Sequence, residues 1–186
     1  MRLGVIPVMS HVFYLASNAV VTGDVIFGAN ANLWFHVVVR GDVAPIRIGA
    51  NTNIQDSSVV HCEHGEEQII EENIVVGHRA LLHGKRVGMG TLVGMGAILL
   101  SGSKIGEECI IAAGTVVKQH AVIPPRSLVA GVPGKIIREV TEADLKTTRD
   151  IMERYVKLAQ AYVRGEYLSS VGTFPMLAMP LAAVAR

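Results

Sequence analysis

An aliphatic residue at every sixth position, glycine at a recurring place in the repeat and few aromatic residues predict an all-β solenoid: a parallel β-helix of hexapeptide repeats with a C-terminal α-helix. A half-buried strand repeats every second residue and an amphipathic helix about every 3.6 residues, so neither explains a period of six. A unit this short cannot bury its own apolar side chain and has to stack on further units. The aliphatic positions in register are Val75, Leu81, Val87, Val93, Leu99, Ile105, Ile111, Val117, Ile123 and Val129.

The period is also found nearer the N-terminus, where two insertions interrupt it. Six-residue steps run over residues 21–39 and 48–60. The step from Val39 to Ile48 and the step from Val60 to Ile69 are nine residues long, and Ile69 to Val75 is again six. Each long step is one repeat plus a three-residue insertion, which places the insertions within Asp42–Ile46 and His61–Ile69. We therefore expect the β-helix to occupy residues 5–135.

Glycine and aromatic content support the same fold. A corner in every repeat needs backbone freedom that glycine supplies at little cost. Aromatic residues make up 5% of the chain, as expected for an interior of stacked Val, Ile and Leu side chains. The alternative is a β-sandwich of short strands, which the strict aliphatic register argues against. The glycines that recur at one corner are Gly84, Gly90, Gly96, Gly102 and Gly114.

The pattern changes after residue 135, where prolines have ended the repeat. Thr141 followed by Asp144 resembles a capping box, and the apolar residues beyond it fall on one helical stripe. We expect a helix from about Thr141 to Arg164, within a segment 136–166 that packs along the outside of the β-helix. The remaining tail, 167–186, is apolar and is either disordered or docked on a neighbouring subunit.

Composition narrows the class of function. A net charge of +1 without a basic run argues against nucleic acid as the main partner. Cys62 and Cys109 lack the spacing of a cysteine zinc site or a disulfide framework, so a reducing cytoplasm is expected. Residues 1–9 are too short and too interrupted for a signal peptide, and no stretch reaches the roughly 18 apolar residues of a membrane span.

Three histidines suggest a metal site. His61 directly follows one repeat position, and His83 lies two residues beyond another, three steps later. If three steps make one coil, these imidazoles lie one above the other, since adjacent strands are ~4.8 Å apart. They can then share one metal ion, whose Zn–N distances are ~2.0–2.1 Å. His78 is one corner away, so it completes the site most simply from another subunit. Three protein ligands and an open fourth position are typical of a catalytic zinc.

Four segments of the chain together resemble a known family. They are Val37–Asp42, Asn53–Asp56 with the following His61, Val76–Gly84, and Leu128–Lys135. In this order and spacing they resemble the gamma-class carbonic anhydrases and their shorter bacterial relatives, over about Val5 to Arg164. The resemblance implies a left-handed β-helix and a homotrimer with Zn²⁺, or Fe²⁺, at each subunit interface.

The resemblance also implies roles for single residues. His61 and His83 of one subunit and His78 of the next are the implied metal ligands. Gln55 is implied to lie beside the metal-bound water and to position it or the substrate.

Four more residues match positions near the site in that family. Arg40 and Asp56 match a pair that meets across the trimer interface, and Asp42 belongs to the same network. A planar guanidinium suits such a carboxylate partner. Tyr155 matches a helix tyrosine that approaches the site in short members, although a packing role on the helix stripe is equally open.

The chain departs from the family archetype between the first two metal histidines. The archetype has a long acidic loop there, whose glutamate shuttles protons, whereas this chain has only Cys62–Gln68. Val43 also stands where the archetype has a glutamate. His64 and Glu66 are the visible replacements, and both are expected to be exposed loop residues.

The sequence thus predicts a zinc-dependent lyase that hydrates carbon dioxide reversibly to bicarbonate. The alternatives are a metal-dependent acyl-CoA thioesterase, a hexapeptide acyltransferase and a non-catalytic trimeric assembly protein. An acyltransferase of this fold needs one histidine as a general base rather than three that converge, so the histidine triad disfavours it.

Overall fold

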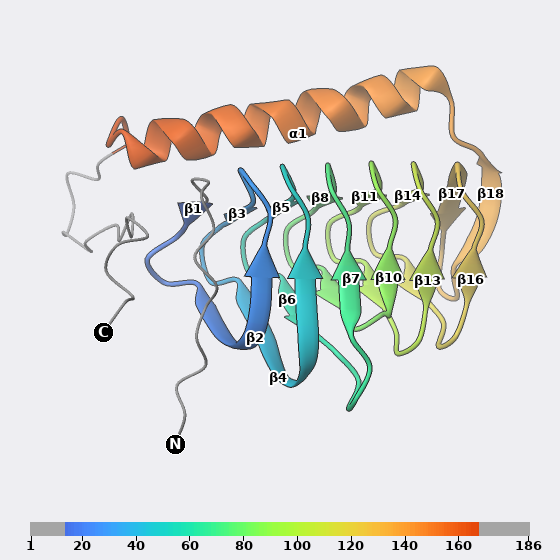
Figure 1. Ribbon diagram of the computed structural model, residues 1–186. Helices are drawn as coiled ribbons and strands as arrows, with labels where there is room; N and C mark the ends of the chain where they lie inside the picture. Colours follow the sequence, from blue (N-terminus) through green and yellow to red (C-terminus); the bar gives the residue numbers. More distant parts are fainter. Residues whose placement is uncertain (1–13, 168–186) are drawn as a thin grey trace.

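The computed structural model describes residues 14–167, which form a three-sided coil of short strands with one helix along its side (Figure 1). Residues 5–13 of the predicted β-helix, and the predicted tail from residue 168 onward, lie outside the described part. Consecutive strands of each face belong to successive coils and pair in parallel.

The first side of the coil, here called the helix face, is one sheet with a single strand from each coil. The last strand, β18, folds back antiparallel to β17 and covers the end of this sheet. The predicted closing segment, Leu128–Lys135, forms this turn. The strands of the sheet are β1 (Tyr14–Leu15), β3 (Asn32–Leu33), β5 (Asn53–Ile54), β8 (Val75–Val76), β11 (Leu92–Val93), β14 (Ile110–Ile111), β17 (Ser127–Ala130) and β18 (Lys135–Glu139).

A second sheet forms the other two sides because its long strands run past a corner. The start of β4 (Val38–Ile48) pairs with β6, and its end pairs with β7. The side with the start of β4 and β6 is here called the histidine face, and the side with β7 the third face. The remaining strands are β2 (Val20–Phe27), β6 (Val59–His61), β7 (Gln68–Ile70), β9 (Leu81–Leu82), β10 (Arg86–Val87), β12 (Ile98–Leu99), β13 (Lys104–Ile105), β15 (Val116–Val117) and β16 (Val122–Ile123).

Stacked aliphatic side chains fill the coil, as the period predicts. Every predicted position from Val87 to Val129 is buried, with at most 9% of its surface exposed. Each such side chain contributes about 1.5–3 kcal/mol by leaving water. The aliphatic residues that recur at every sixth position therefore form the core of this protein.

The predicted register is wrong by one residue in the middle of the chain. The interior residues there are Ile70, Val76 and Leu82, whereas Ile69 is 37% exposed. The insertion after β6 is one residue longer than predicted and the corner after β9 is one residue shorter, so the two differences cancel by Val87. Val75 is also buried, but it is not part of the coil interior: it lies on the outer surface of the helix face, where α1 covers it.

The predicted glycine corners have two different causes. Gly90, Gly96, Gly102 and Gly114 have positive φ angles, which confirms the need for glycine's backbone freedom. Gly84 is needed for a different reason: there is no space for a side chain, since a Cβ there would lie 2.5 Å from Oγ of Ser103.

The helix α1 spans Glu142–Val163 and contacts β1, β3, β5 and β8 of the helix face. The predicted capping box is confirmed: Thr141 Oγ1 accepts a hydrogen bond from the Asp144 N–H, and Asp144 accepts one from the Thr141 N–H. The start of the segment 136–166, before the predicted helix, belongs to β18 (Lys135–Glu139).

Candidate metal centre

His61 and His83 lie one above the other on the histidine face, as predicted from the repeat. His61 ends β6 and His83 follows β9, and these strands pair with Val60 opposite Leu82. The His83 Nε2 is 3.2 Å from the His61 Nδ1, and the ring centroids are 5.1 Å apart. Two ring nitrogens of adjacent coils therefore face one another.

The spacing of this pair suits a tetrahedral cation. Two nitrogens bound to one tetrahedral zinc are ~3.3 Å apart, given Zn–N distances of ~2.0–2.1 Å. The observed separation of 3.2 Å between His61 and His83 needs little adjustment to match it. Both rings are half-buried, which leaves the pair accessible from outside the coil.

Asp42 and Arg40 orient His61 from the coil below. Asp42 Oδ1 is 3.2 Å from His61 Nε2, and Arg40 Nη1 donates to Asp42 Oδ2 at 2.6 Å. The hydrogen bond from Arg40, followed by that from His61, holds the pKa of the Asp42 carboxyl below its usual range. A carboxylate on the second nitrogen is a common support for a metal-binding histidine.

Ser101 and Glu63, neither of which was among the predicted site residues, support His83. The Ser101 hydroxyl is 3.1 Å from His83 Nδ1. The Glu63 carboxylate hydrogen-bonds the same hydroxyl, which lowers the pKa of Glu63. The expected loop candidates, His64 and Glu66, are exposed, and Glu66 pairs with a lysine instead.

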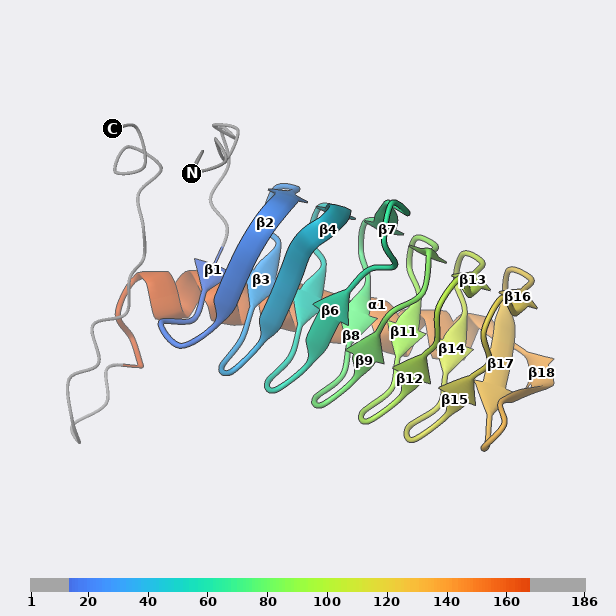
Figure 2. The same cartoon turned by 90° about the horizontal axis from the view of Figure 1, so that it is seen from below.

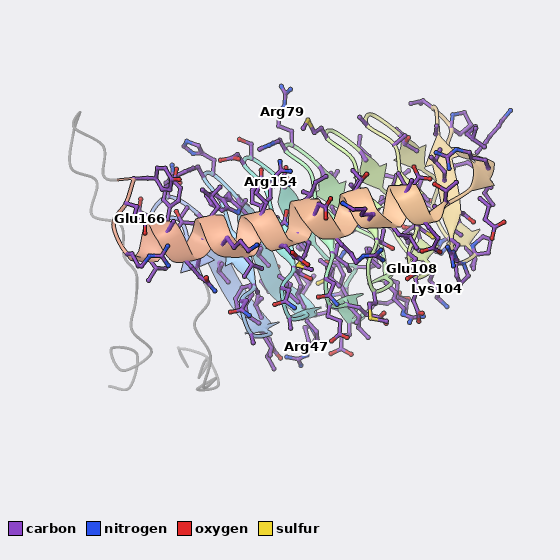
Figure 3. The ribbon with its side chains drawn as sticks, turned by 90° about the horizontal axis from the view of Figure 1, so that it is seen from above. Arg47, Arg79, Lys104, Glu108, Arg154 and Glu166 are labelled. Carbon is purple, nitrogen blue, oxygen red and sulfur yellow. The ribbon has the colours of Figure 1, made fainter. Side chains whose placement is uncertain are left out.

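His78 lies apart from this pair, at the corner between the helix face and the histidine face. Its Nδ1 is 2.8 Å from Asp56 Oδ2, on the coil below. Within residues 14–167, no three His, Cys, Asp or Glu side chains converge in a way suited to a metal. Arg79, the next residue, projects on the opposite side of α1 from Arg47 of the third face (Figure 3).

Gln55 and Tyr155 accompany His78 and Asp56. Gln55 is only 4% exposed, and its Nε2 donates to the Asn53 side chain at 3.0 Å. The Tyr155 ring packs edge-on against Trp34, with centroids 5.3 Å apart. Burial and, next, the Asp56 charge raise the pKa of Tyr155. Tyr155 thus has the predicted packing role and also lies near Asp56.

The eight predicted site residues therefore fall into two groups in one chain. The pair group on the histidine face consists of Arg40, Asp42, His61 and His83, and the corner group consists of Gln55, Asp56, His78 and Tyr155. Side-chain contacts connect the pair group. In the corner group, Asp56 contacts His78 and lies near Tyr155, and Gln55 precedes Asp56 in the chain and contacts Asn53. The pairing of Arg40 with Asp56 across the trimer interface stays a prediction; within one chain Arg40 contacts Asp42 and Asp56 contacts His78.

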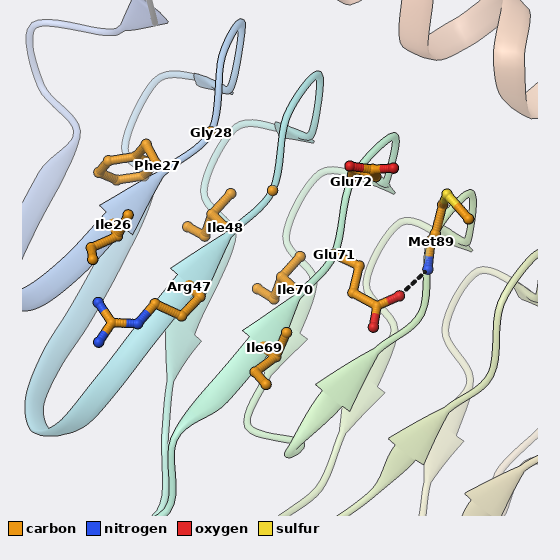
Figure 4. Close-up of a pocket in the computed structure, with 11 residues that line it drawn as sticks. Ile26, Phe27, Gly28, Arg47, Ile48, Ile69, Ile70, Glu71, Glu72 and Met89 are labelled. Carbon is orange, nitrogen blue, oxygen red and sulfur yellow. Dashed lines mark hydrogen bonds between the residues drawn. The ribbon is translucent and has the colours of Figure 1, made fainter. Parts of the chain in front are cut away.

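A groove at another corner contains none of these residues. It has a volume of about 440 Å³ and lies where the third face turns toward the helix face (Figure 4). Its lining is mostly apolar, including Ile26 and Ile70, and Glu71 accepts a hydrogen bond from the Met89 N–H at 2.9 Å. The groove and the histidines are thus separate features.

Known proteins are similar to this chain both in the repeat and in the sequence. Residues 84–119 match the bacterial transferase hexapeptide family (six repeats). A Geobacillus kaustophilus protein named carbonic anhydrase is 40% identical, with 86% of this chain and 87% of that protein covered. The mitochondrial gamma carbonic anhydrase 1 of Arabidopsis thaliana is 35% identical, with 84% of this chain and 59% of that protein covered.

A solved structure agrees with the fold. A Bacillus cereus protein described as a candidate acetyltransferase superposes with a TM-score of 0.76 at 40% identity, over 81% of this chain and 87% of that one. The fold and repeat are those of a hexapeptide-repeat left-handed β-helix protein. Within that class, the chain belongs to the gamma carbonic anhydrase family. Among the described residues, no helix is long and apolar enough to cross a membrane.

Proposed function

We propose that this protein is a zinc-dependent lyase that interconverts carbon dioxide and bicarbonate at a site shared by two subunits of a homotrimer. The observation that carries the proposal is the division of the site into two groups. His61 and His83 supply two nitrogens 3.2 Å apart, and His78 is held on another corner by Asp56. A neighbouring copy that presents its His78 to this pair supplies the third ligand.

An uncovered apolar row supports assembly through the histidine face. The outward residues of successive strands there are all aliphatic, and α1 contacts other strands. Figure 2 presents β4, β6, β9, β12 and β15 in one row, with α1 behind them. Burial of such a row by a second copy is favourable at about 25 cal/mol per Å². The row consists of Val20, Val38, Val59, Leu81, Ile98 and Val116.

Zinc at this site, with Fe²⁺ as the alternative, would supply Lewis-acid chemistry and activate water as a nucleophile at neutral pH. The surrounding residues orient the ligands. Asp42 fixes the His61 ring, Ser101 fixes that of His83, and Asp56 fixes that of His78. Each contact selects which ring nitrogen is left to bind the cation.

Gln55 is proposed to position water or substrate. Asn53 holds one amide hydrogen of Gln55, which fixes the orientation of the amide. Its other N–H and its carbonyl oxygen are left to bind a small polar ligand, since an amide has two donors and an acceptor. Asp42 contacts His61 directly, and Glu63 is connected to His83 through the Ser101 hydroxyl. This connection makes Glu63 a better candidate than His64 or Glu66 for carrying protons to and from the site.

Acyl transfer is the second candidate, favoured by the acetyltransferase description of the Bacillus cereus neighbour. A general base needs one imidazole, so the facing pair of imidazoles has no part in that reaction. The cytoplasm is the proposed compartment, because cysteine pairs usually form disulfides in oxidising compartments and Cys62 and Cys109 are both free and buried.

The test combines metal content, mass and activity on one sample purified without oxygen. We expect one metal per chain and about three times the chain mass of 19.9 kDa. Carbon dioxide hydration should be lost on chelation and restored by Zn²⁺ or Fe²⁺. A monomer that binds stoichiometric metal would refute the shared site, and turnover of acetyl-CoA without hydration would favour the second candidate.

A further inference from the structure

A glutamine occupies the aliphatic interior of the coil. Gln68, the first residue of β7, lies opposite Ile46 and is completely buried. An amide placed among aliphatic side chains costs free energy unless its polar atoms are hydrogen-bonded. Its Oε1 has no partner in the described residues, so only the Nε2 compensates for burial.

The Gln68 Nε2 donates two hydrogen bonds, which bracket one of the proposed metal ligands. The acceptors are the backbone carbonyls of Leu82, at 3.2 Å, and Gly84, at 2.8 Å. These are the residues immediately before and after His83. One side-chain amide thus fastens the backbone on both sides of this histidine.

The corner that contains His83 differs from its equivalents in later coils. From Leu82 to the next interior residue is five positions, whereas the same corner after Leu99 or Val117 takes six. The shortened corner also packs so closely that Gly84 has no room for a Cβ. Leu82 ends β9, whereas Gly84 lies in the shortened corner outside any strand, and Gln68 donates to the carbonyls of both.

We propose that Gln68 is a positioning residue: it clamps the His83 backbone and so sets the distance between the two facing imidazoles. The proposal rests on the proposed metal function of His61 and His83. Ser101 orients the His83 ring from outside the coil, and Gln68 holds its backbone from inside. The two supports act on different degrees of freedom of the same ligand.

The first experiment replaces the clamp by an apolar side chain of similar volume, Gln68→Met. Cobalt(II) replaces the native metal, because its visible spectrum reports the coordination geometry. We expect about tenfold weaker Co²⁺ binding, the effect typical of removing a residue that supports a metal ligand. The visible spectrum should change, and the trimer should be retained. The matched control is Thr115→Val, which removes a buried, unpartnered hydroxyl far from His83 and should leave binding and spectrum unchanged.

The second experiment needs no metal and so separates the clamp from the proposed function. Hydrogen exchange is measured on metal-free protein, over peptides that contain the amides of His83 and Lys85, which bond Leu99 and Ser103. Gln68→Met should speed their exchange about tenfold, the equivalent of one lost hydrogen bond, while peptides around Val117 stay protected. Wild-type protein that binds no metal would overturn the proposed function alone. Unchanged exchange and unchanged Co²⁺ binding in Gln68→Met would overturn the clamp.

Discussion

Asp56 Oδ2 lies 2.8 Å from His78 Nδ1, on the coil directly below it. A carboxylate on Nδ1 holds the proton there and leaves Nε2 as the nitrogen free to bind a cation. The predicted interfacial ligand is therefore already oriented within its own chain, before any second subunit is present.

Asp56→Asn should weaken metal binding about 10–100-fold, the usual effect of losing such a support. The neutral amide no longer selects the His78 tautomer. Competition with a chelator measures the affinity. Asp24→Asn, which removes an exposed partner of Arg47 on the third face, is the control and should have no effect. Equal losses in both variants would contradict the assigned role.

The ligand histidines and Gln55 should separate binding from chemistry. His61→Ala, His78→Ala and His83→Ala should each lose metal, since two imidazoles leave an incomplete site. Gln55→Ala should keep the metal and lower hydration by about 10–100-fold, because it acts on water or substrate. Metal analysis and stopped-flow hydration measure the two effects. Loss of metal in Gln55→Ala would overturn the distinction between binding and chemistry. The control is His36→Ala, which removes an exposed histidine that is hydrogen-bonded to Asn18.

The aliphatic row of the histidine face should be the trimer contact. Ile98→Asp places a charge in the middle of that row, and an unpaired charge at an interface strongly opposes association. Light scattering should then report the single-chain mass of 19.9 kDa. Val122→Asp, at a position 70% exposed on the third face, should remain a trimer. The opposite pattern would move the interface to the third face.

An asparagine ladder should stabilise the corner between the third face and the helix face. Asn51 accepts a side-chain hydrogen bond from Asn30 at 3.1 Å and donates one to Asn73 at 2.9 Å, and its φ is 56°. Asn51→Ala should lower the free energy of unfolding by about 2–3 kcal/mol, from two hydrogen bonds and a left-handed backbone. Chemical denaturation measures it. Ser57→Ala, with a φ of 60°, tests the backbone contribution alone and should cost less.

The helix cap should make stability depend on pH. The hydrogen bond from Arg138, then those from Thr141, hold the pKa of Asp144 far below the usual range of an aspartate. A depressed pKa in the folded state means that the stabilisation is present above about pH 4 and is lost as the pH falls toward the folded pKa. Asp144→Asn should therefore lower the melting temperature at pH 7, with a difference that narrows below pH 4. Glu153→Gln, an exposed change on the same helix, should show no such difference.

Some of the site could be predicted because the coil repeats. His61 and His83 stack since one coil separates them, and Ser101 follows His83 by 18 residues, which is again three steps of six. The same arithmetic would have found Ser101. Glu63 could not be found this way, because it lies in an insertion where the period gives no position.

By itself, the sequence determined the parallel β-helix, the capped C-terminal helix and the stacking of His61 on His83. A six-residue period and a capping box are local patterns whose consequences do not depend on distant residues. Only the tertiary structure decided that Ile70 rather than Ile69 faces the interior, that Gln68 lies behind His83, and that the site residues divide between a face and a corner. A difference of one residue in the length of an insertion or a corner shifts the register and has no signal in the sequence. Packing against neighbouring coils therefore decides which side chain points inward.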